Sequence, residues 1–218
     1  MILIVLIALL AALFYPNAPR GSYLIFASLA SPTPDSILAN TEHLRIGYDL
    51  MNLFYLIDNY TDIANAAVAK ELVDITIDAL QNPHKVRPKG ESILGEIARQ
   101  SVSQNYLIIT YLKSTAFLSR FWARAIQTAS LPSQRRFLDS FTKYLRAVVV
   151  EALDREQGHC RSMDDYLKLR RYTIGAEPSF LLHEMGMDLP DEVFYHPVIM
   201  ELAENIIDLV LIDNVKSY

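Results

Sequence analysis

The sequence has few of the residues that stabilise small secreted domains or bind zinc. It contains one cysteine, Cys160, in 218 residues, so an internal disulfide framework is excluded and a reducing compartment is favoured. Its five histidines are scattered, without a His-Glu-x-x-His motif or paired Cys/His spacing. Such spacing is typical of zinc sites. The sequence therefore does not favour a zinc protein, and we expect a cytoplasmic location.

Glycine and positive charge are also scarce. Only 7 residues are glycine, whereas 51% are apolar, and many of the apolar residues recur at helical spacing. The net charge is −5, and no Lys/Arg run is interleaved with aromatic residues, which argues against nucleic-acid binding. We predict one all-α domain with a sizeable core.

The amino terminus, "MILIVLIALLAALFYP", is apolar over residues 1–15. This segment is shorter than the about 20 residues that span a bilayer, and no basic residue precedes it. Three interpretations remain open: a membrane anchor, a wrongly assigned start, or an apolar first helix. We therefore treat residues 1–20 as a separate segment and residues 21–218 as the domain.

Periodicity and capping signals divide the domain into helices. A basic loop, "NPHKVRPKG", interrupts them, and "LPDEVFYHP" is predicted to be a loop or turn. Gly175, close to Pro178, is expected to end one helix. The predicted helices are 42–62, 65–81, 91–100, 121–129, 133–156, 163–175 and 198–218, with a short one in "SFLLHEMGM".

Two aspartates end the apolar stripe of the first strong helix, "NLFYLIDNYTD". Asp58 and Asp62 are four residues apart and therefore share a helix face, which also carries Met51 and Phe54. Unpaired charges on a buried face would cost several kcal/mol. Either these acids are protonated, or the stripe opens into a cavity that holds cations.

The last predicted helix, "ELAENIIDLVLIDNVKSY", has the same character. One of its apolar stripes leads to Asp213 and then Ser217, and the neighbouring stripe leads to Asn214. The first stripe consists of Leu202, Ile206, Leu209 and Val210, and the second of Ala203, Ile207 and Val210. Two helices thus end in oxygen-bearing side chains.

Mg²⁺ prefers oxygen ligands and often joins one or two carboxylates to substrate phosphates. Arg171, between the two helices in sequence, would bind a diphosphate bidentately. Each feature also has a plain interpretation: exposed acids, a solvated arginine pair at Arg170 and Arg171, a helix stop at Gly175, and core aromatics. These aromatics are Phe54, Tyr55, Phe137, Phe141, Tyr144, Phe180, Phe194 and Tyr195.

Several stretches together resemble fungal class I sesquiterpene synthases of the basidiomycete kind. They include "EHLRIGYDLMNLFYLIDNYTD", "FWARAIQTASLPSQRRFLDSF", "LKLRRYTIGAEPSF" and "ENIIDLVLIDN". Together the resembling stretches cover most of residues 23–214. The resemblance implies a class I terpenoid synthase helical bundle. It also implies Mg²⁺-dependent ionisation and cyclisation of a prenyl diphosphate, with farnesyl diphosphate expected and three metal ions in the complete enzyme.

The resemblance also assigns roles to residues. Asp58 corresponds to the metal-bridging aspartate and Asp62 to the distal acid, with Asn59 in place of a more usual acid. Arg171 corresponds to the diphosphate-sensing arginine and Gly175 to the effector at the helix break. Family length selects Asn214 as the second metal ligand, whereas spacing to a serine selects Asp213 with Ser217.

Two departures shape what we expect of the chain as written. Residues 101–120 split a stretch that otherwise reads "ARQFWARA", and they resemble a translated intron, as do residues 215–218. The motif's glutamate and later helices would follow Tyr218, so we expect this 218-residue chain to be inactive or poorly folded.

Two other functions are alternatives to the terpene cyclase. One is a catalytically silent helical protein held at a membrane by residues 1–15. The other is a prenyl transferase, which would usually need a second aspartate-rich motif that "LIDNVKSY" does not supply. The sequence does not indicate an oligomeric state.

Overall fold

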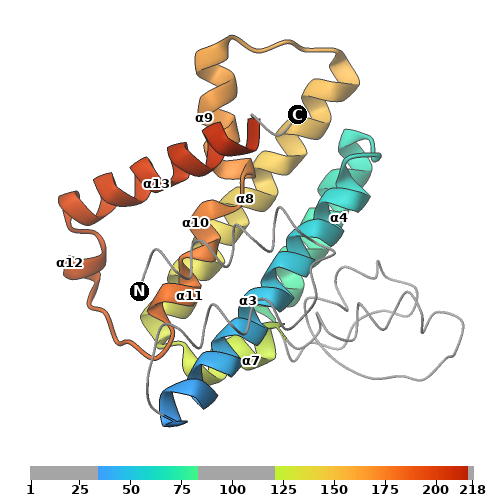
Figure 1. Cartoon of the computed structure of the whole chain (residues 1–218). Coiled ribbons are helices and arrows are strands. Elements are labelled where there is room, and N and C mark those ends of the chain that lie inside the picture. Colours follow the sequence, from blue (N-terminus) through green and yellow to red (C-terminus); the bar gives the residue numbers. More distant parts are fainter. Residues whose placement is uncertain (1–33, 83–120, 216–218) are drawn as a thin grey trace, which may run out of the picture.

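The computed structural model describes residues 34–82 and 121–215, which form helices and connecting turns without a strand in these ranges (Figure 1). This confirms the predicted all-α class. Three long helices, α3, α4 and α8, run side by side, and α9 to α13 lie along one side of them. The helices are α3 (Pro34–Thr61), α4 (Ala66–Gln81), α7 (Phe121–Thr128), α8 (Leu131–Gln157), α9 (Met163–Thr173), α10 (Ala176–Ser179), α11 (Leu181–Glu184), α12 (Asp191–Phe194) and α13 (Pro197–Val215).

The predicted helices that fall in the described ranges match these elements, with shifts at the ends. The first strong helix begins at Pro34 and not at residue 42, and "LPDEVFYHP" contains the short helix α12. The helix predicted over 163–175 ends at Thr173, because Gly175 adopts φ +71 and starts α10. Local turns and caps decide such boundaries, and periodicity does not resolve them.

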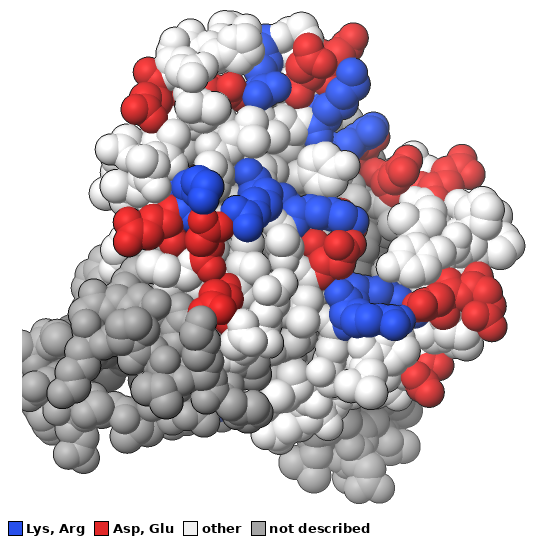
Figure 2. Space-filling model, turned by 180° about the vertical axis from the view of Figure 1, so that it is seen from behind, with Lys and Arg blue, Asp and Glu red and all other residues white. Residues whose placement is uncertain are grey.

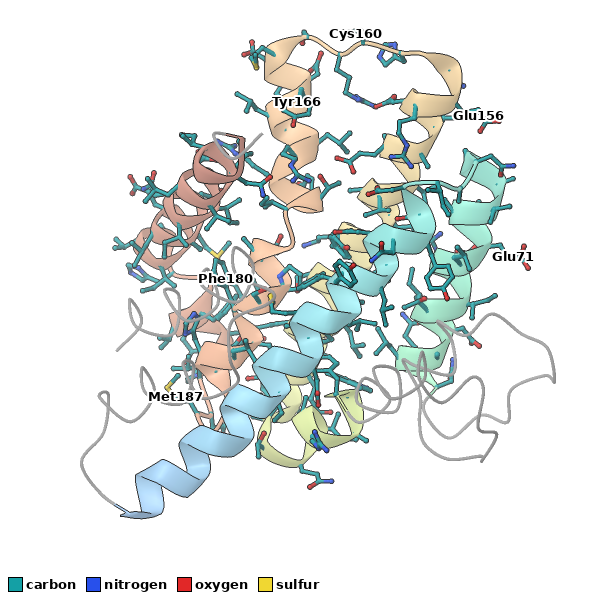
Figure 3. The ribbon with its side chains drawn as sticks, turned by 45° about the vertical axis from the view of Figure 1, so that its right-hand side comes forward. Glu71, Glu156, Cys160, Tyr166, Phe180 and Met187 are labelled. Atoms are coloured by element: carbon teal, nitrogen blue, oxygen red, sulfur yellow. The ribbon has the colours of Figure 1, made fainter. Side chains whose placement is uncertain are left out.

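Capping side chains fix the start of α4 and hold it against the end of α8. The Asn65 side chain accepts a hydrogen bond from the Val68 amide at 2.9 Å, which satisfies a free donor of the first turn. A Glu156 carboxylate oxygen accepts from the Ala66 amide, also at 2.9 Å. Glu156 lies near the end of α8, close to the start of α4 (Figure 3).

Helices α4 and α8 pack antiparallel. Arg146, in the second half of α8, donates to Asp74 in the middle of α4 at 2.6 Å, and Glu156 further along α8 reaches the start of α4. Lys70 also pairs with Asp74 on the exposed side. Seen from behind, basic and acidic side chains lie next to one another on the surface (Figure 2). Such exposed pairs contribute little stability each.

Aromatic side chains form a continuous row through the core. Phe54 of α3 meets Tyr144 of α8 edge-on at 4.9 Å, and Phe137 stacks on Phe141 at 5.1 Å and on Trp122 of α7 at 5.0 Å. These residues are all buried. Phe54, Phe137, Phe141 and Tyr144 are thus core residues packed on one another. Tyr55, on the outer side of α3, and Tyr195, which follows the last residue of α12, are instead exposed.

A buried ion network ties the start of α8 to α11 and α12. The Arg136 guanidinium donates to Glu184 at 2.5 Å, to the Leu189 carbonyl oxygen at 2.9 Å and to Asp191 at 2.5 Å. Glu184 also accepts from the Ser133 hydroxyl at 2.9 Å. The guanidinium lies 4.3 Å above the ring of Phe194. These contacts fix the turn that leads from α11 towards α13.

The inward side of α13 differs from the first stripe proposed above. Leu202 and Leu209 are 50% and 68% exposed, whereas Ile207, Val210 and Leu211 are buried. Because α13 packs on α9 and α10, only the side that meets these helices is covered. The buried side is the one that continues to Asn214. The prediction that the stripe through Leu202 and Leu209 is buried is therefore wrong.

Several sequence-based predictions lie outside the described residues. They concern residues 1–20, the greater part of the basic loop, the helix predicted at 91–100, the insert at 101–120 and residues 216–218. None of the helices in the described ranges is long and apolar enough to cross a membrane.

Candidate functional site

Two carboxylates stand at the C-terminal end of α3. Asp58 and Asp62 are both solvent-accessible, while their neighbours Ile57 and Thr61 are buried. The Asp62 amide donates to the Asp58 carbonyl oxygen at 2.8 Å, so the helical turn continues through both residues. The C-terminal end of a helix carries a partial negative charge. Acids at this end are unfavourable unless cations lie close by.

Asp58 is crowded by protein although part of it remains accessible. Desolvation raises the pKa of its carboxyl to about 6, a hydrogen bond from the Tyr144 hydroxyl opposes this rise, and Asp62 and Glu151 add to it. Arg170 lowers the same pKa. The Tyr144 hydroxyl donates to Asp58 Oδ1 at 3.0 Å. Asp58 therefore sits where additional positive charge would be favourable.

The raised pKa predicts a stability change with pH. The folded-state pKa of Asp58, about 6, lies above the ordinary 3.8. Ionisation of Asp58 therefore lowers the free energy of unfolding: the loss is absent below pH 4, grows as the pH rises and is complete above pH 6. We expect Asp58→Asn to raise the free energy of unfolding at pH 7.5 by about 1 kcal/mol, since solvent screens much of the shift. Urea unfolding at pH 7.5 and pH 4 measures this.

Asp165 supplies a control of opposite sign for this measurement. The Ser162 side chain donates to its carboxylate and lowers its pKa, so Asp165→Asn should lower stability at pH 7.5. A stability of Asp58→Asn equal to that of the unaltered chain at both pH values would contradict the prediction.

Arg170 connects α9 to α13, and its positive charge lies close enough to Asp58 to lower the pKa of that carboxyl. Its Nη2 donates to Asn214 Oδ1 at 2.8 Å, and its Nη1 donates to the Thr173 hydroxyl at 3.2 Å. Thr173 in turn donates to Glu151 of α8 at 2.6 Å. Arg170 is thus oriented directly by Asn214 of α13 and, through Thr173 of its own helix, by Glu151 of α8.

Arg171 points to a different surface. Its Nε and Nη2 donate to the two carboxylate oxygens of Asp208, each at 2.7 Å. Both side chains are largely exposed, at 46% and 38%. The structure therefore joins Asn214 to Arg170, whose charge acts on Asp58. Arg171 is instead paired with Asp208.

Gly175 lies at the break between α9 and α10. Its φ of +71 is in the left-handed region, and an added Cβ would meet the ring of Phe54 at 3.1 Å. A side chain at this position is therefore disfavoured by its backbone conformation and by its neighbour. The break sits against the residue that is one helical turn before Asp58.

We expect Gly175→Ala to lower the free energy of unfolding by about 1–3 kcal/mol, because it adds left-handed strain and displaces Phe54. Gly158→Ala is the matched control, since Gly158 has φ +61 but no atom within 4 Å of an added Cβ. Thermal unfolding of both variants separates the two effects. Equal losses in the two variants would show that the Phe54 contact contributes nothing.

The other predicted ligands are only partly described. Asp213 lies in α13, but its side chain and the whole of Ser217 fall outside the described part of the chain. Among the described side chains, no group of three or more His, Cys, Asp or Glu residues is arranged to hold a metal ion. The described oxygen donors of the site lie on α3, α8 and α13.

This donor set fits a divalent cation of the Mg²⁺ type. Mg²⁺ keeps several waters and takes one or two carboxylates, together with substrate phosphates, so it does not need a closed cage. Asp58 offers an accessible carboxylate whose desolvation and acidic neighbours disfavour its ionised form. A bound cation would remove that penalty.

Three residues of this site were not predicted as such. The residues are Tyr144, which the sequence predicts as a core aromatic, Arg170, which it predicts on a solvated helix face, and Thr173. Their spacing carried a weak signal: Tyr144 and Glu151 are two turns apart on α8, and Arg170 and Thr173 are one turn apart on α9. The sequence alone does not indicate which side of these helices faces Asp58.

Comparison with known proteins gives consistent matches. Residues 49–214 match the family described as "Terpene synthase family 2, C-terminal metal binding". The chain is 49% identical over 193 residues to Sesquiterpene synthase 14 of Postia placenta, covering 88% of this chain and 48% of that protein. It is 44% identical over 200 residues to Delta(6)-protoilludene synthase of Armillaria gallica, covering 91% and 51%. The chain thus spans about half the length of these relatives.

A solved structure shows the same fold at low identity. The SVS_A2 protein from ancestral sequence reconstruction superposes with a TM-score of 0.65 at 18% identity, covering 99% of this chain and 63% of that chain. The helical arrangement of Figure 1 therefore occurs in an experimentally determined protein.

Proposed function

The chain belongs to terpene synthase family 2, and on this premise we propose that it carries the diphosphate-binding site of a metal-dependent terpene cyclase. The reaction is ionisation of a prenyl diphosphate followed by cyclisation of the carbocation. The family's metal-binding description supports the use of a divalent metal. We also propose that this metal is Mg²⁺, that the complete enzyme holds three ions and that the substrate is farnesyl diphosphate.

One observation carries the proposal: the exposed Asp58 carboxylate stands at the negative end of α3, shares its helix face with Asp62 and accepts a hydrogen bond from the Tyr144 hydroxyl at 3.0 Å. In the absence of a cation, this arrangement is unfavourable at neutral pH. Binding of a divalent ion and a diphosphate would balance the charges on both sides. The proposed metal ligands are Asp58 and Asp62 on α3 and Asn214 on α13, with Asp213 and Ser217 as the remaining candidates.

When bound, a divalent cation stabilises the negative charge that develops on a diphosphate leaving group. The protein's own groups act around it. Asp58 and Asp62 provide carboxylate oxygens from adjacent turns of one helix. The buried aromatic row below them excludes water from this side of the site, which favours a carbocation over hydrolysis.

We further propose that Arg170 donates hydrogen bonds to the diphosphate. It is half-buried, faces Asp58 and reaches Asn214 at 2.8 Å. Arg171 is the arginine that the resemblance implies, but its fork is occupied by Asp208. A contact from Arg171 to the diphosphate would require that ion pair to open. The two arginines can be distinguished experimentally.

Farnesyl diphosphate is proposed because the relatives' names describe sesquiterpene and protoilludene synthases. A cytoplasmic location likewise stays a prediction from cysteine usage.

The test measures binding of inorganic pyrophosphate to the purified chain by calorimetry, with Mg²⁺ and with EDTA. We expect binding only with Mg²⁺, and we expect Arg170→Gln to weaken it by about tenfold or more, as for loss of a charge-assisted bond. Arg171→Gln is the matched control and should change it by less than about threefold.

Volatile products formed from farnesyl diphosphate and Mg²⁺ are measured in parallel by gas chromatography with mass spectrometry. Pyrophosphate binding that persists in EDTA would contradict the proposed site. The reverse order of the two arginine variants would restore Arg171 as the diphosphate ligand.

A further inference from the structure

Tyr144 is held rigidly beneath the acidic end of α3. Its side chain is 2% exposed, and its ring packs edge-on against Phe54 at 4.9 Å and in a tilted arrangement against Phe141 at 5.5 Å. A ring enclosed on these sides has little freedom to turn. Its hydroxyl nevertheless reaches an accessible group, since it donates to Asp58 Oδ1 at 3.0 Å.

The charged side chains of Asp62, Glu151 and Arg170 lie around the Asp58 carboxylate. The Tyr144 hydrogen bond engages only Oδ1, which leaves Oδ2 and one lone pair of Oδ1 available to a cation. A phenol hydroxyl is protonated near neutral pH, so the Tyr144 hydroxyl remains a donor.

The ring of Tyr144 is supported by residues from two other elements. Phe54 lies one helical turn before Asp58 on α3, and its ring also lies 3.1 Å from where a Cβ of Gly175 would be. The absence of a side chain at the α9–α10 break therefore leaves room for Phe54, which in turn packs on Tyr144. A contiguous path joins Gly175, Phe54, Tyr144 and Asp58.

We propose that Tyr144 is a positioning residue: its hydroxyl holds the Asp58 carboxylate in the orientation that binds the divalent cation. This inference rests on the proposed function, because it assumes that Asp58 is a metal ligand. Hydrogen-bond partners that orient metal ligands are commonly needed for full metal affinity.

The experiment compares Tyr144→Phe with the unaltered 218-residue chain. Mn²⁺ affinity in the presence of inorganic pyrophosphate is measured by calorimetry. We expect Tyr144→Phe to bind Mn²⁺ about 10-fold more weakly, in the range typical for partners of metal ligands. Tyr166→Phe is the matched control, because Tyr166 is 39% exposed on α9 (Figure 3) and should leave the affinity unchanged.

A second measurement separates positioning from a general loss of structure. The carboxyl carbon of Asp58 is observed by ¹³C NMR in aspartate-labelled chain and assigned by its absence in Asp58→Asn. We expect its resonance to move in Tyr144→Phe and to stay in place in Tyr166→Phe, while circular dichroism shows both variants folded.

The outcomes are distinguishable. If the unaltered chain binds Mn²⁺ and Tyr144→Phe binds it equally tightly, the positioning role is overturned and the proposed function stands. If the unaltered chain binds no Mn²⁺ with pyrophosphate, the proposed function is overturned, together with the inference that rests on it. An Asp58 resonance that is unchanged in Tyr144→Phe overturns the positioning role in either case.

Discussion

Replacement of Asp58 with alanine is expected to weaken Mn²⁺ binding in the presence of pyrophosphate by at least about 100-fold. Loss of a proposed metal ligand should exceed the roughly 10–100-fold cost of losing a partner of such a ligand. It also leaves Arg170 without the carboxylate that it faces. Calorimetry measures the affinity.

Two variants show whether this loss is specific. Asp58→Asn keeps the size of the side chain and removes its charge, so it should bind Mn²⁺ nearly as weakly as Asp58→Ala. Asp165→Ala removes an exposed acid near the start of α9 and should leave the affinity unchanged. An affinity of Asp58→Ala within threefold of the unaltered chain would rule out Asp58 as a metal ligand.

Replacement of Arg136 with alanine is expected to lower the free energy of unfolding by about 3–5 kcal/mol, the usual result of removing one partner of a buried ion pair. Arg136 and Glu184 are each 5% exposed, so Glu184 would keep an uncompensated buried charge. The Leu189 carbonyl oxygen would also lose a donor. Urea unfolding followed by circular dichroism measures the change.

Arg135→Ala is the matched control for this prediction. Arg135 pairs with Asp191 as well, at 3.0 Å, but its side chain is 70% exposed, and loss of such a surface pair costs about 0–1 kcal/mol. The double variant Arg136→Leu, Glu184→Leu should regain much of the lost stability, because it removes both buried charges. Equal stabilities of the Arg135 and Arg136 variants would contradict the buried-pair argument.

Much of the fold follows from periodicity, because helices with one apolar side must bury it. The second helix, predicted over 65–81, is observed as α4 (Ala66–Gln81), and the fifth, predicted over 133–156, as α8 (Leu131–Gln157). Asn65 and Ser130 supply the caps that fix their starts. Helix α13 was harder to orient, because apolar residues occur on several of its sides and only packing on α9 and α10 shows which side is buried.

The site was predictable only in part, for a geometric reason. The two acids of "DNYTD" share a helix face, so their pairing can be read from local spacing. Which of two adjacent arginines faces them depends on the rotation of α9 relative to α8 and α13. Arg170 and Arg171 differ by one position, about 100° around the helix, and the sequence gives no local preference between them. The contribution of Tyr144 likewise depends on its long-range contact with α3.

The exposed Cys160 lies in the turn between α8 and α9 (Figure 3). Since it is the only thiol in the sequence, a maleimide dye attaches at one known place without any substitution. Tyr144 and Arg170 are carried by the two helices that this turn connects. The native chain thus provides its own attachment point for a fluorescent reporter of rearrangement between α8 and α9.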